Sequence, residues 1–294
     1  MTREFALNGC KLINADCFDA MSEIADGSVD CVITDMPYAS SFGRCTSLNF
    51  DKKPIDHEQF WHQVERITKP SAPVVCFANL RLAHDLISTS RDRWTFYDLV
   101  WSKNNKCGFL WAKHQPLRGH EHILVFTRKG EFRNACYSPM MLPSGRIGSR
   151  RITRKQTSVY GKVNTYTSVS NGMMHPCSVL QFDNDRRGNQ RCYHSTQKPL
   201  KLLQWLVATY SREGNTVLDP FAGSFTTALA CMALGRKCIA IEKEEKYFSV
   251  GVERLKSAWH SNMFIGGMDD NVSTIAIPRV EVENADSVIH SPAV

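Results

Sequence analysis

The sequence predicts an α/β fold in which helices cover both faces of a mostly parallel sheet. Short apolar runs alternate along the chain with segments of helical spacing, and this alternation is typical of parallel sheets. Two of the runs, residues 29–34 and 216–218, read as buried strands, and an aspartate follows each of them. After the second aspartate a glycine-containing turn leads into a helix, as in the nucleotide-binding crossovers of doubly wound sheets.

The spacing of apolar residues predicts the remaining elements. Further strands are expected within residues 8–17 and over 74–78, 95–101, 122–127 and 237–241. Helices are expected over residues 18–25, 58–68, 80–88, 199–211, 224–234 and 244–260. Two stretches have no such pattern. Residues 39–53 are polar and predict a loop beside the strand end, and no structure is assigned to residues 261–294.

Length and cysteine usage narrow the class of protein. The 294 residues are enough for one domain with an insertion or for two domains. The eleven cysteines are scattered and form no Cys-x-x-Cys pair, so free thiols are expected and no metal site. The N-terminus does not read as a signal peptide, and no apolar stretch approaches the ~20 residues that cross a bilayer. A protein of the reducing cytoplasm, without a membrane partner, is therefore expected.

Positive charge is concentrated in one part of the chain. The net charge is +7, and residues 131–193 hold ten Lys and Arg against three Asp and Glu, which is also +7. Between residues 132 and 182 there is no acid at all. Such a local basic surface most often binds phosphate backbone, which indicates nucleic acid as the partner; a solvated basic loop is the alternative. The Gly, Ser, Asn and Thr content of this segment predicts irregular structure with short strands.

The first candidate site is the tetrapeptide Asp35-Met36-Pro37-Tyr38, which follows the strand over residues 29–34. The carboxyl end of such a strand is where open α/β sheets bind ligands. Asp35 offers a carboxylate acceptor, and the proline holds the preceding Met36 carbonyl in a fixed direction. Tyr38 offers a flat face. Two acceptors and a stacking surface suit a planar ring that carries an exocyclic amino group, although an acidic turn closed by a core tyrosine would look similar.

The second candidate site is the turn after residues 216–218, together with an acid about twenty residues further on. Asp219 and Gly223 lie in the turn, and Glu242 ends the next expected strand, where it can accept hydrogen bonds from both hydroxyls of a ribose. A dinucleotide site is the rival interpretation. The spacing is not Gly-x-Gly-x-x-Gly, and one glycine leaves little room for a pyrophosphate, so a nucleoside without phosphates fits better.

Three motifs together resemble one known family, the DNA methyltransferases that methylate amino groups. Residues 35–38 resemble the Asp-Pro-Pro-Tyr motif, residues 218–225 the Asp-Pro-Phe-Ala-Gly-Ser-Gly cofactor loop, and residues 194–199 the His-Pro-Thr-Gln-Lys-Pro segment. The catalytic motif precedes the cofactor motif, with the basic segment between them. This order is similar to that of the circularly permuted β class of adenine-N6 and cytosine-N4 enzymes, and the resemblance covers residues 8–260.

The resemblance implies a Rossmann-like sheet of seven strands and S-adenosylmethionine as cofactor. It divides the chain into a catalytic half (1–130), a target-recognition insertion (131–193), a cofactor-binding half (194–260) and a C-terminal extension (261–294). The implied catalytic residues are Asp35, Met36, Pro37 and Tyr38. The implied cofactor-binding residues are Asp16, Cys17, Asp219, Phe221, Gly223, Ser224, Glu242, Lys198 and Pro199. The implied DNA-binding residues are Arg146, Arg150, Arg151, Arg154, Lys155, Lys162, Arg186 and Arg187.

Three positions depart from the family pattern. Met36 replaces the first proline of the catalytic motif, which leaves its carbonyl available but makes the turn less rigid. Ser195 replaces a proline of the third motif. Phe225 replaces the last glycine of the cofactor loop. If that position requires a positive φ, phenylalanine is strained there; if it is already helical, phenylalanine simply packs.

The function that the resemblance implies is site-specific methylation of adenine N6 in double-stranded DNA. Asp35 and the Met36 carbonyl would accept the amino hydrogens, and the base would flip out of the duplex to stack on Tyr38. Family usage favours Asp at the first motif position for adenine and Ser for cytosine. Cytosine-N4 methylation, methylation of RNA or of a protein amide, and DNA binding with little or no catalysis are the alternatives. Cytosine-C5 chemistry is rejected, because the only Pro-Cys pair, Pro176-Cys177, lies inside the basic segment.

Such an enzyme would be cytoplasmic, bacterial or phage-encoded, and associated with the nucleoid. A homodimer and a cognate restriction enzyme are the further partners to be considered.

Overall fold

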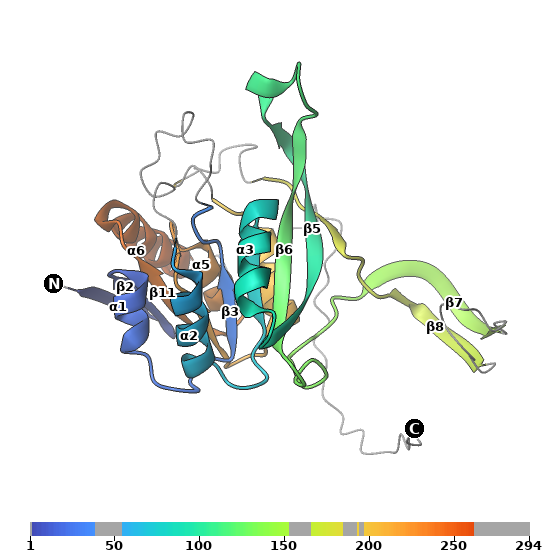
Figure 1. Ribbon diagram of the computed structural model, residues 1–294. Coiled ribbons are helices and arrows are strands. Elements are labelled where there is room, and N and C mark those ends of the chain that lie inside the picture. The colour runs from blue at the N-terminus through green and yellow to red at the C-terminus, as the bar shows by residue number, and fades with distance from the viewer. Residues whose placement is uncertain (1, 39–54, 153–165, 185–192, 194–196, 262–294) are drawn as a thin grey trace.

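A computed structural model describes residues 2–38, 55–152, 166–184, 193 and 197–261 (Figure 1). In this part of the chain the main sheet has nine strands, in the order β1-β2-β11-β10-β3-β4-β6-β5-β9. Their bounds are β1 Arg3–Leu7, β2 Cys10–Asn14, β3 Cys31–Thr34, β4 Val74–Ala78, β5 Trp94–Cys107, β6 Arg118–Arg128, β9 Val179–Gln181, β10 Thr216–Asp219 and β11 Lys237–Glu242.

The sheet is mostly parallel, as predicted. Only β1 and β6 run antiparallel to their neighbours. The expected count of seven strands is wrong, because one extra strand lies at each edge. The polar N-terminal segment pairs with β2 as β1, and three residues from the basic segment pair with β5 as β9. Both are edge strands, and edge strands can be short or polar because only one side of each is hydrogen-bonded to the sheet.

Helices cover both faces of the sheet (Figure 1). Their bounds are α1 Cys17–Ser22, α2 His57–Ile67, α3 Leu80–Ser90, α4 Leu200–Tyr210, α5 Thr226–Ala233 and α6 Glu245–His260. One buried cluster is formed by α1, α2 and α3 against the sheet, and a second by α4, α5 and α6 against the opposite face. The alternation of strands and helices in the sequence therefore predicted the layers correctly.

Helix α2 illustrates how local sequence positions each helix. The Asp56 side chain accepts a hydrogen bond from the backbone N–H of Gln59 and caps the first turn. Phe60 and Trp61, together with residues one and two turns further on, form the fully buried face of the helix. The Trp61 ring lies 4.9 Å from that of Phe126 on β6, an edge-to-face contact that joins the helix to the sheet.

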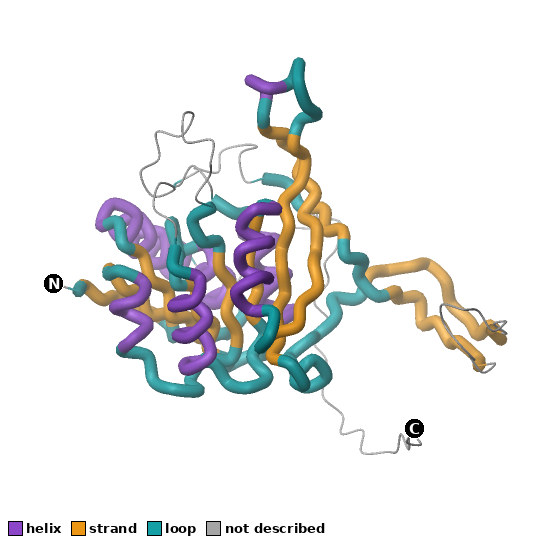
Figure 2. The backbone as a smooth tube through the Cα atoms, in the orientation of Figure 1, coloured by secondary structure: helices purple, strands orange, loops and turns teal. Residues whose placement is uncertain are grey.

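Two antiparallel parts extend away from the layered body (Figure 2). Strands β5 and β6 continue past the rest of the sheet and end in a short 3-10 helix, η2 (Phe109–Trp111). Strands β7 (Leu142–Ile152) and β8 (Tyr166–Met174) form a separate two-stranded ribbon within the basic segment. The expectation of irregular structure with short strands was wrong here. None of the described side chains of β7 and β8 is buried, so the alternation of buried and exposed residues that identifies a strand is missing there.

Other expectations differ from the structure mainly in their limits. The strand expected over 95–101 extends to Cys107, and the one expected over 122–127 begins at Arg118. The loop expected over 39–53 and most of the tail from residue 261 lie outside the described residues. Among the helices that the structure describes, none is long and apolar enough to cross a membrane.

Candidate active site

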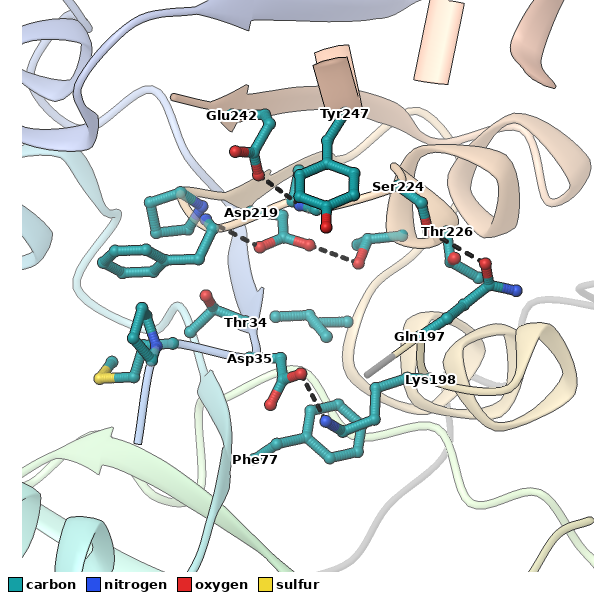
Figure 3. A pocket seen from close by; sticks show the side chains of 18 of the residues that line it. Thr34, Asp35, Phe77, Gln197, Lys198, Asp219, Ser224, Thr226, Glu242 and Tyr247 are labelled. Atoms are coloured by element: carbon teal, nitrogen blue, oxygen red, sulfur yellow. Dashed lines mark hydrogen bonds and ion pairs between the residues drawn. The ribbon is translucent and has the colours of Figure 1, made fainter. Parts of the chain in front are cut away.

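A cavity of about 770 Å³ lies at the carboxyl ends of the parallel strands (Figure 3). It brings together both motifs predicted from the sequence. The predicted catalytic and cofactor residues that line it are Asp16, Cys17, Asp35, Met36, Pro37, Tyr38, Lys198, Asp219, Phe221, Gly223, Ser224 and Glu242. Pro199 does not line it; this residue is buried and forms the N-cap of α4.

Strand order explains why the three acids of the two motifs share one cavity. Asp35 follows β3, Asp219 ends β10 and Glu242 ends β11, and these strands are parallel neighbours. Their carboxyl ends therefore meet at the same edge of the sheet. In Figure 3 the carboxylates of Glu242, Asp219 and Asp35 lie one below the other, in the order of their strands.

The Asp35 carboxylate has two unlike oxygens. Oδ2 forms an ion pair with Lys198 Nζ. Oδ1 is buried and has no hydrogen-bond partner among the described residues. A buried acceptor without a partner is costly, so it indicates a place where a ligand donates a hydrogen bond. The Asp35 carboxylate is thus held by Lys198 through one oxygen and open to a ligand through the other.

Lys198 belongs to a buried network of charges at the lower end of the cavity as drawn in Figure 3. Its Nζ lies 3.5 Å from Glu121 Oε2, and Glu121 also pairs with Lys103. The side chains of Lys198, Glu121 and Lys103 are only 8%, 16% and 11% exposed. The Tyr38 hydroxyl lies 3.4 Å from Glu121 Oε2, so the network contacts the aromatic residue of the motif as well.

Burial and ion pairing act in opposite directions on these groups. Burial raises the pKa of Asp35, and the neighbouring Lys198 offsets part of that rise. Burial alone would lower the pKa of Lys198, but Asp35 and Glu121 raise it above its usual value, which keeps the ammonium charged. Burial would likewise raise the pKa of Glu121, but the two lysines outweigh it and the pKa is lowered. The network therefore pairs two lysines with two carboxyl groups.

Asp219 is held by its own turn. Its Oδ1 accepts a hydrogen bond from the Phe221 N–H at 3.2 Å, and its Oδ2 accepts one from Thr227 Oγ1 at 2.5 Å. The first donor lies in the turn that joins β10 to α5 and the second in the first turn of α5, so the carboxylate ties the turn to the start of the helix. Burial raises the pKa of Asp219 to about 6.

Glu242 fixes the other side of the same turn. Its Oε2 accepts a hydrogen bond from the Gly223 N–H at 2.9 Å, and its Oε1 accepts one from the Glu244 N–H at 2.8 Å. Each carboxylate oxygen has a second lone pair left for a ligand. Burial raises the pKa of Glu242 to about 7. Tyr247, on the first turn of α6, lines the cavity beside this acid (Figure 3).

The start of helix α1 also lines the cavity, through Asp16 and Cys17. Asp16 is its N-cap and accepts a hydrogen bond from the Phe18 N–H at 3.0 Å. Burial acts to raise the pKa of Asp16, but a 2.9 Å hydrogen bond from Lys243 Nζ helps to lower it overall. Burial raises the pKa of the Cys17 thiol to about 12, which keeps it uncharged against the cavity.

Phe225, the departure in the cofactor loop, has φ 60° and ψ 34°. The position therefore does require the left-handed conformation, and phenylalanine is strained there. The ring is also fully buried, 6.1 Å from the ring of Phe248. Both interpretations of the sequence were partly right, because Phe225 is strained in its backbone and packed in its side chain. Just before it, Ser224 Oγ donates to Gln197 Oε1 at 3.1 Å.

Three of the predicted DNA-binding residues belong to the described part of the chain, and the lining of this cavity does not include them. Arg146 is exposed on β7, and Arg150 and Arg151 follow on the same strand. The others lie outside the described residues: Arg154, Lys155, Lys162, Arg186 and Arg187. Ser195 lies outside them as well.

The lining of the cavity also includes residues that were not predicted from the sequence, among them Lys103, Glu121, Gln197 and Tyr247. Gln197 could have been found, because it belongs to the segment over 194–199 that was singled out. Glu121 and Lys103 gave no local signal. They become neighbours only because β5 and β6 pair with Trp101 opposite Glu121.

Comparison with known proteins agrees with this geometry. The model of the DNA methylase family matches residues 29–253. The Type II methyltransferase M.HpaI of Haemophilus parainfluenzae is 26% identical over 262 residues, which cover 85% of this chain and 75% of the relative. The DNA adenine methyltransferase YhdJ of Escherichia coli is 49% identical over 67 residues, 23% of each chain.

A solved structure shows the same fold. The match to the crystal structure of the M1.HpyAVI-SAM complex covers 83% of this chain and 99% of the other chain, with a TM-score of 0.55 and 21% sequence identity. The family model spans both halves of the cavity, from the strand before Asp35 to α6 beyond Glu242. The chain is therefore a member of the DNA methylase family that methylates the amino groups of adenine N6 and cytosine N4.

Proposed function

We propose that this protein methylates adenine N6 in double-stranded DNA, with S-adenosylmethionine as the methyl donor. The observation that carries the proposal is the pair of unlike oxygens on Asp35. Lys198 holds Oδ2, and Oδ1 lies in the cavity as a buried acceptor with no partner among the described residues. An exocyclic amino group would supply the hydrogen bond that this oxygen lacks.

The residues around Glu242 fit a nucleoside-containing donor. Glu242 presents lone pairs to a ribose, and Phe221 and Tyr247 provide aromatic surface in the same cavity. A cavity of about 770 Å³ has the size of sites that bind ligands of this kind. When bound, the donor supplies a methyl group that is activated by attachment to a sulfonium. The acids Asp16, Asp219 and Glu242 favour such a cationic ligand.

The chain itself contributes orientation and proton handling. Asp35 Oδ1 accepts one amino hydrogen, the Met36 carbonyl accepts the other, and together they localise the lone pair on nitrogen. Tyr38 stacks against the flipped base, which returns about 1–3 kcal/mol of the cost of unstacking. The proton released after transfer passes to Asp35 Oδ1, a carboxyl whose pKa burial has raised. Lys198 is assigned to this catalytic group, as the cation that holds Asp35, rather than to the donor site.

The basic segment is proposed as the part that recognises the target. Residues 131–193 would form the recognition insertion, residues 1–130 and 194–260 the catalytic and donor halves, and residues 261–294 an extension. The ribbon of β7 and β8 lies apart from the main sheet (Figure 2), which supports this division. Arg146 and the other predicted basic residues would contact phosphates, with some of them reading base edges.

Adenine is preferred over cytosine because the motif begins with Asp35 and because a DNA adenine methyltransferase is 49% identical over 67 residues. The decisive experiment is incubation with labelled S-adenosylmethionine and unmethylated genomic DNA, followed by mass spectrometry of the nucleosides. N6-methyladenine is expected. If N4-methylcytosine forms instead, the substrate base is cytosine rather than adenine. If no nucleoside becomes labelled, the proposed function is wrong.

Two further proposals concern partners of the protein. The name of the Type II relative suggests a cognate restriction enzyme in a bacterial or phage setting. The second proposed partner is another copy of the same chain, and light scattering of the purified protein tests whether such a homodimer forms.

A further inference from the structure

The part of the β5–β6 hairpin that extends beyond the sheet, residues 103–120, is here called the arm. Figure 1 shows it projecting from the molecule, with η2 at its end. The arm begins at the candidate active site, because Lys103, Asn105, Lys106 and Cys107 line the cavity. Its end is therefore placed to meet whatever substrate enters the cavity from that edge of the sheet.

The end of the arm carries large apolar side chains that are exposed to solvent. Phe109, Leu110 and Trp111 are 70%, 83% and 47% exposed. Single exposed apolar residues are ordinary, but three consecutive ones at the end of an extended hairpin form an exposed apolar patch, and such patches mark binding surfaces. Gly108, with φ 95°, provides the left-handed turn that starts η2 and presents them together.

The charge of the arm identifies the chemistry of that partner. From residue 99 to residue 120 there is no acid, whereas Lys103, Lys106, Lys113 and Arg118 are basic. Lys103 is neutralised by Glu121, but Lys106, Lys113 and Arg118 are exposed. A partner that is anionic outside and apolar inside matches this pattern. Duplex DNA has that composition, with phosphates along its edges and stacked bases between them.

We propose that the end of the arm inserts into the duplex beside the target base and fills the space which that base leaves when it flips out. This inference rests on the proposed function. Apolar side chains that enter a base step unstack it at a cost of a few kcal/mol, and the exposed apolar surface of the arm recovers part of that cost on burial. Lys113 and Arg118 would contact the flanking phosphates. The arm would thus act on the duplex while Asp35 and Tyr38 act on the extruded base.

The test compares the variant Phe109→Ser/Leu110→Ser/Trp111→Ser with wild type on two substrates. Both substrates carry the target sequence, which is first identified by sequencing genomic DNA that the protein has methylated. One substrate is a perfect duplex, and the other has a mismatch opposite the target base. A mismatched base is already partly unstacked, so it needs the arm less. On the perfect duplex the variant should lose about tenfold to a hundredfold in kcat/KM, and on the mismatched duplex it should come within about threefold of wild type.

Trp259→Ala is the matched control for Trp111→Ala. Trp259 lies on α6, away from the arm, and the two side chains are similarly exposed, at 44% and 47%. Only Trp111→Ala should lower kcat/KM on the perfect duplex. Unaltered donor affinity and melting temperature would confirm that the variants are folded, as expected for residues at an exposed end.

Three results would overturn the inference: wild-type activity of the triple variant on the perfect duplex, an equal loss on both substrates, or a loss of a dimer in light scattering without any loss of methylation. Failure of the proposed function looks different, because then the wild-type protein methylates neither substrate.

Discussion

A Cβ atom at Gly251 would lie 2.0 Å from Cδ2 of Phe225. The phenylalanine that replaces a glycine in the donor loop is thus accommodated by a glycine inside α6. Glycine in a helix interior lowers stability by about 1 kcal/mol relative to alanine. In α6 the glycine leaves the space in which the Phe225 ring is buried. The two positions form one packing unit.

Gly251→Ala should therefore destabilise the protein by about 1–3 kcal/mol, although the same change in an open helix would stabilise it. In a Phe225→Ala background the ring is gone, and Gly251→Ala should instead stabilise by a few tenths to about 1 kcal/mol. Urea unfolding of the wild type, both single variants and the double variant gives the coupling free energy. Additive effects would show that the helix can move away from the ring.

Phe225→Gly should lower stability but leave donor affinity within about threefold of wild type. The loop already has φ 60° at this position, so glycine relieves strain without changing the shape that the donor meets. Calorimetric titration with S-adenosylmethionine measures the affinity, and urea unfolding measures the stability. Markedly tighter binding would mean that the loop leaves this conformation when no donor is bound.

Donor binding should strengthen as pH rises from about 6 to 8. Burial raises the pKa of Glu242 to about 7, and only the ionised carboxylate offers all its lone pairs to ribose hydroxyls. Below that pKa, affinity should fall by up to about tenfold per pH unit. Calorimetry across this range tests the trend. Glu242→Gln should bind weakly at every pH, and a wild-type affinity independent of pH would contradict the role of Glu242.

Stability without donor should change in the opposite direction. The folded-state pKa of Asp219 is raised from 3.8 to about 6, and that of Glu242 from 4.5 to about 7. Each raised carboxyl contributes stability that is fully present below its unfolded pKa and is lost as pH rises through its folded pKa. The melting temperature of the protein alone should therefore fall between about pH 4 and pH 7 through these groups. In Asp219→Asn the part of this fall near pH 6 should disappear.

Asp35→Ala should abolish methyl transfer and leave donor affinity largely intact, because the carboxylate lies with Lys198 rather than at Glu242. Lys198→Met should also reduce transfer sharply, since removal of the cation raises the pKa of Asp35 further and protonates it. Activity of Lys198→Met should recover partly as pH rises. Single-turnover rates from pH 6 to 9 measure this. Lys201→Met, at an exposed position in the first turn of α4, is the matched control. Near-normal turnover by Asp35→Ala would contradict the catalytic assignment.

Neutralising Arg150, Arg151, Arg154 and Lys155 should weaken DNA binding and flatten its salt dependence. Each lost phosphate contact removes about 0.9 from the slope of log K against log salt on duplex DNA. A salt titration of duplex binding compares wild type with this variant, and relaxed sequence preference would identify residues that read bases. Lys201→Ala/Lys237→Ala, on exposed positions of α4 and β11, is the control. Identical slopes would place the recognition surface elsewhere on the chain.

The sequence was sufficient to predict the layers and the two motifs that meet at the cavity, because these depend on local patterns. A buried strand followed by Asp35, and a strand, a glycine turn and Glu242, are visible as short motifs. The network of Glu121 and Lys103 was not visible, since it depends on the register of two antiparallel strands. The left-handed backbone conformation of Phe225 could likewise not be predicted from the identity of that residue alone. It becomes understandable only with Gly251, which lies on another element.

The neighbouring strands β3 and β10 have a consequence for how the chain folds during synthesis. The backbone N–H of Thr216 at the start of β10 donates to Asp30, 186 residues earlier, just before β3. A ribosome must therefore complete most of the polypeptide before β3, which already pairs with β4, gains β10 as its second partner. Until then β3 has an unpaired edge, which is a site for aggregation. Slow closure of such a distant pair is expected to make refolding slow and sensitive to concentration.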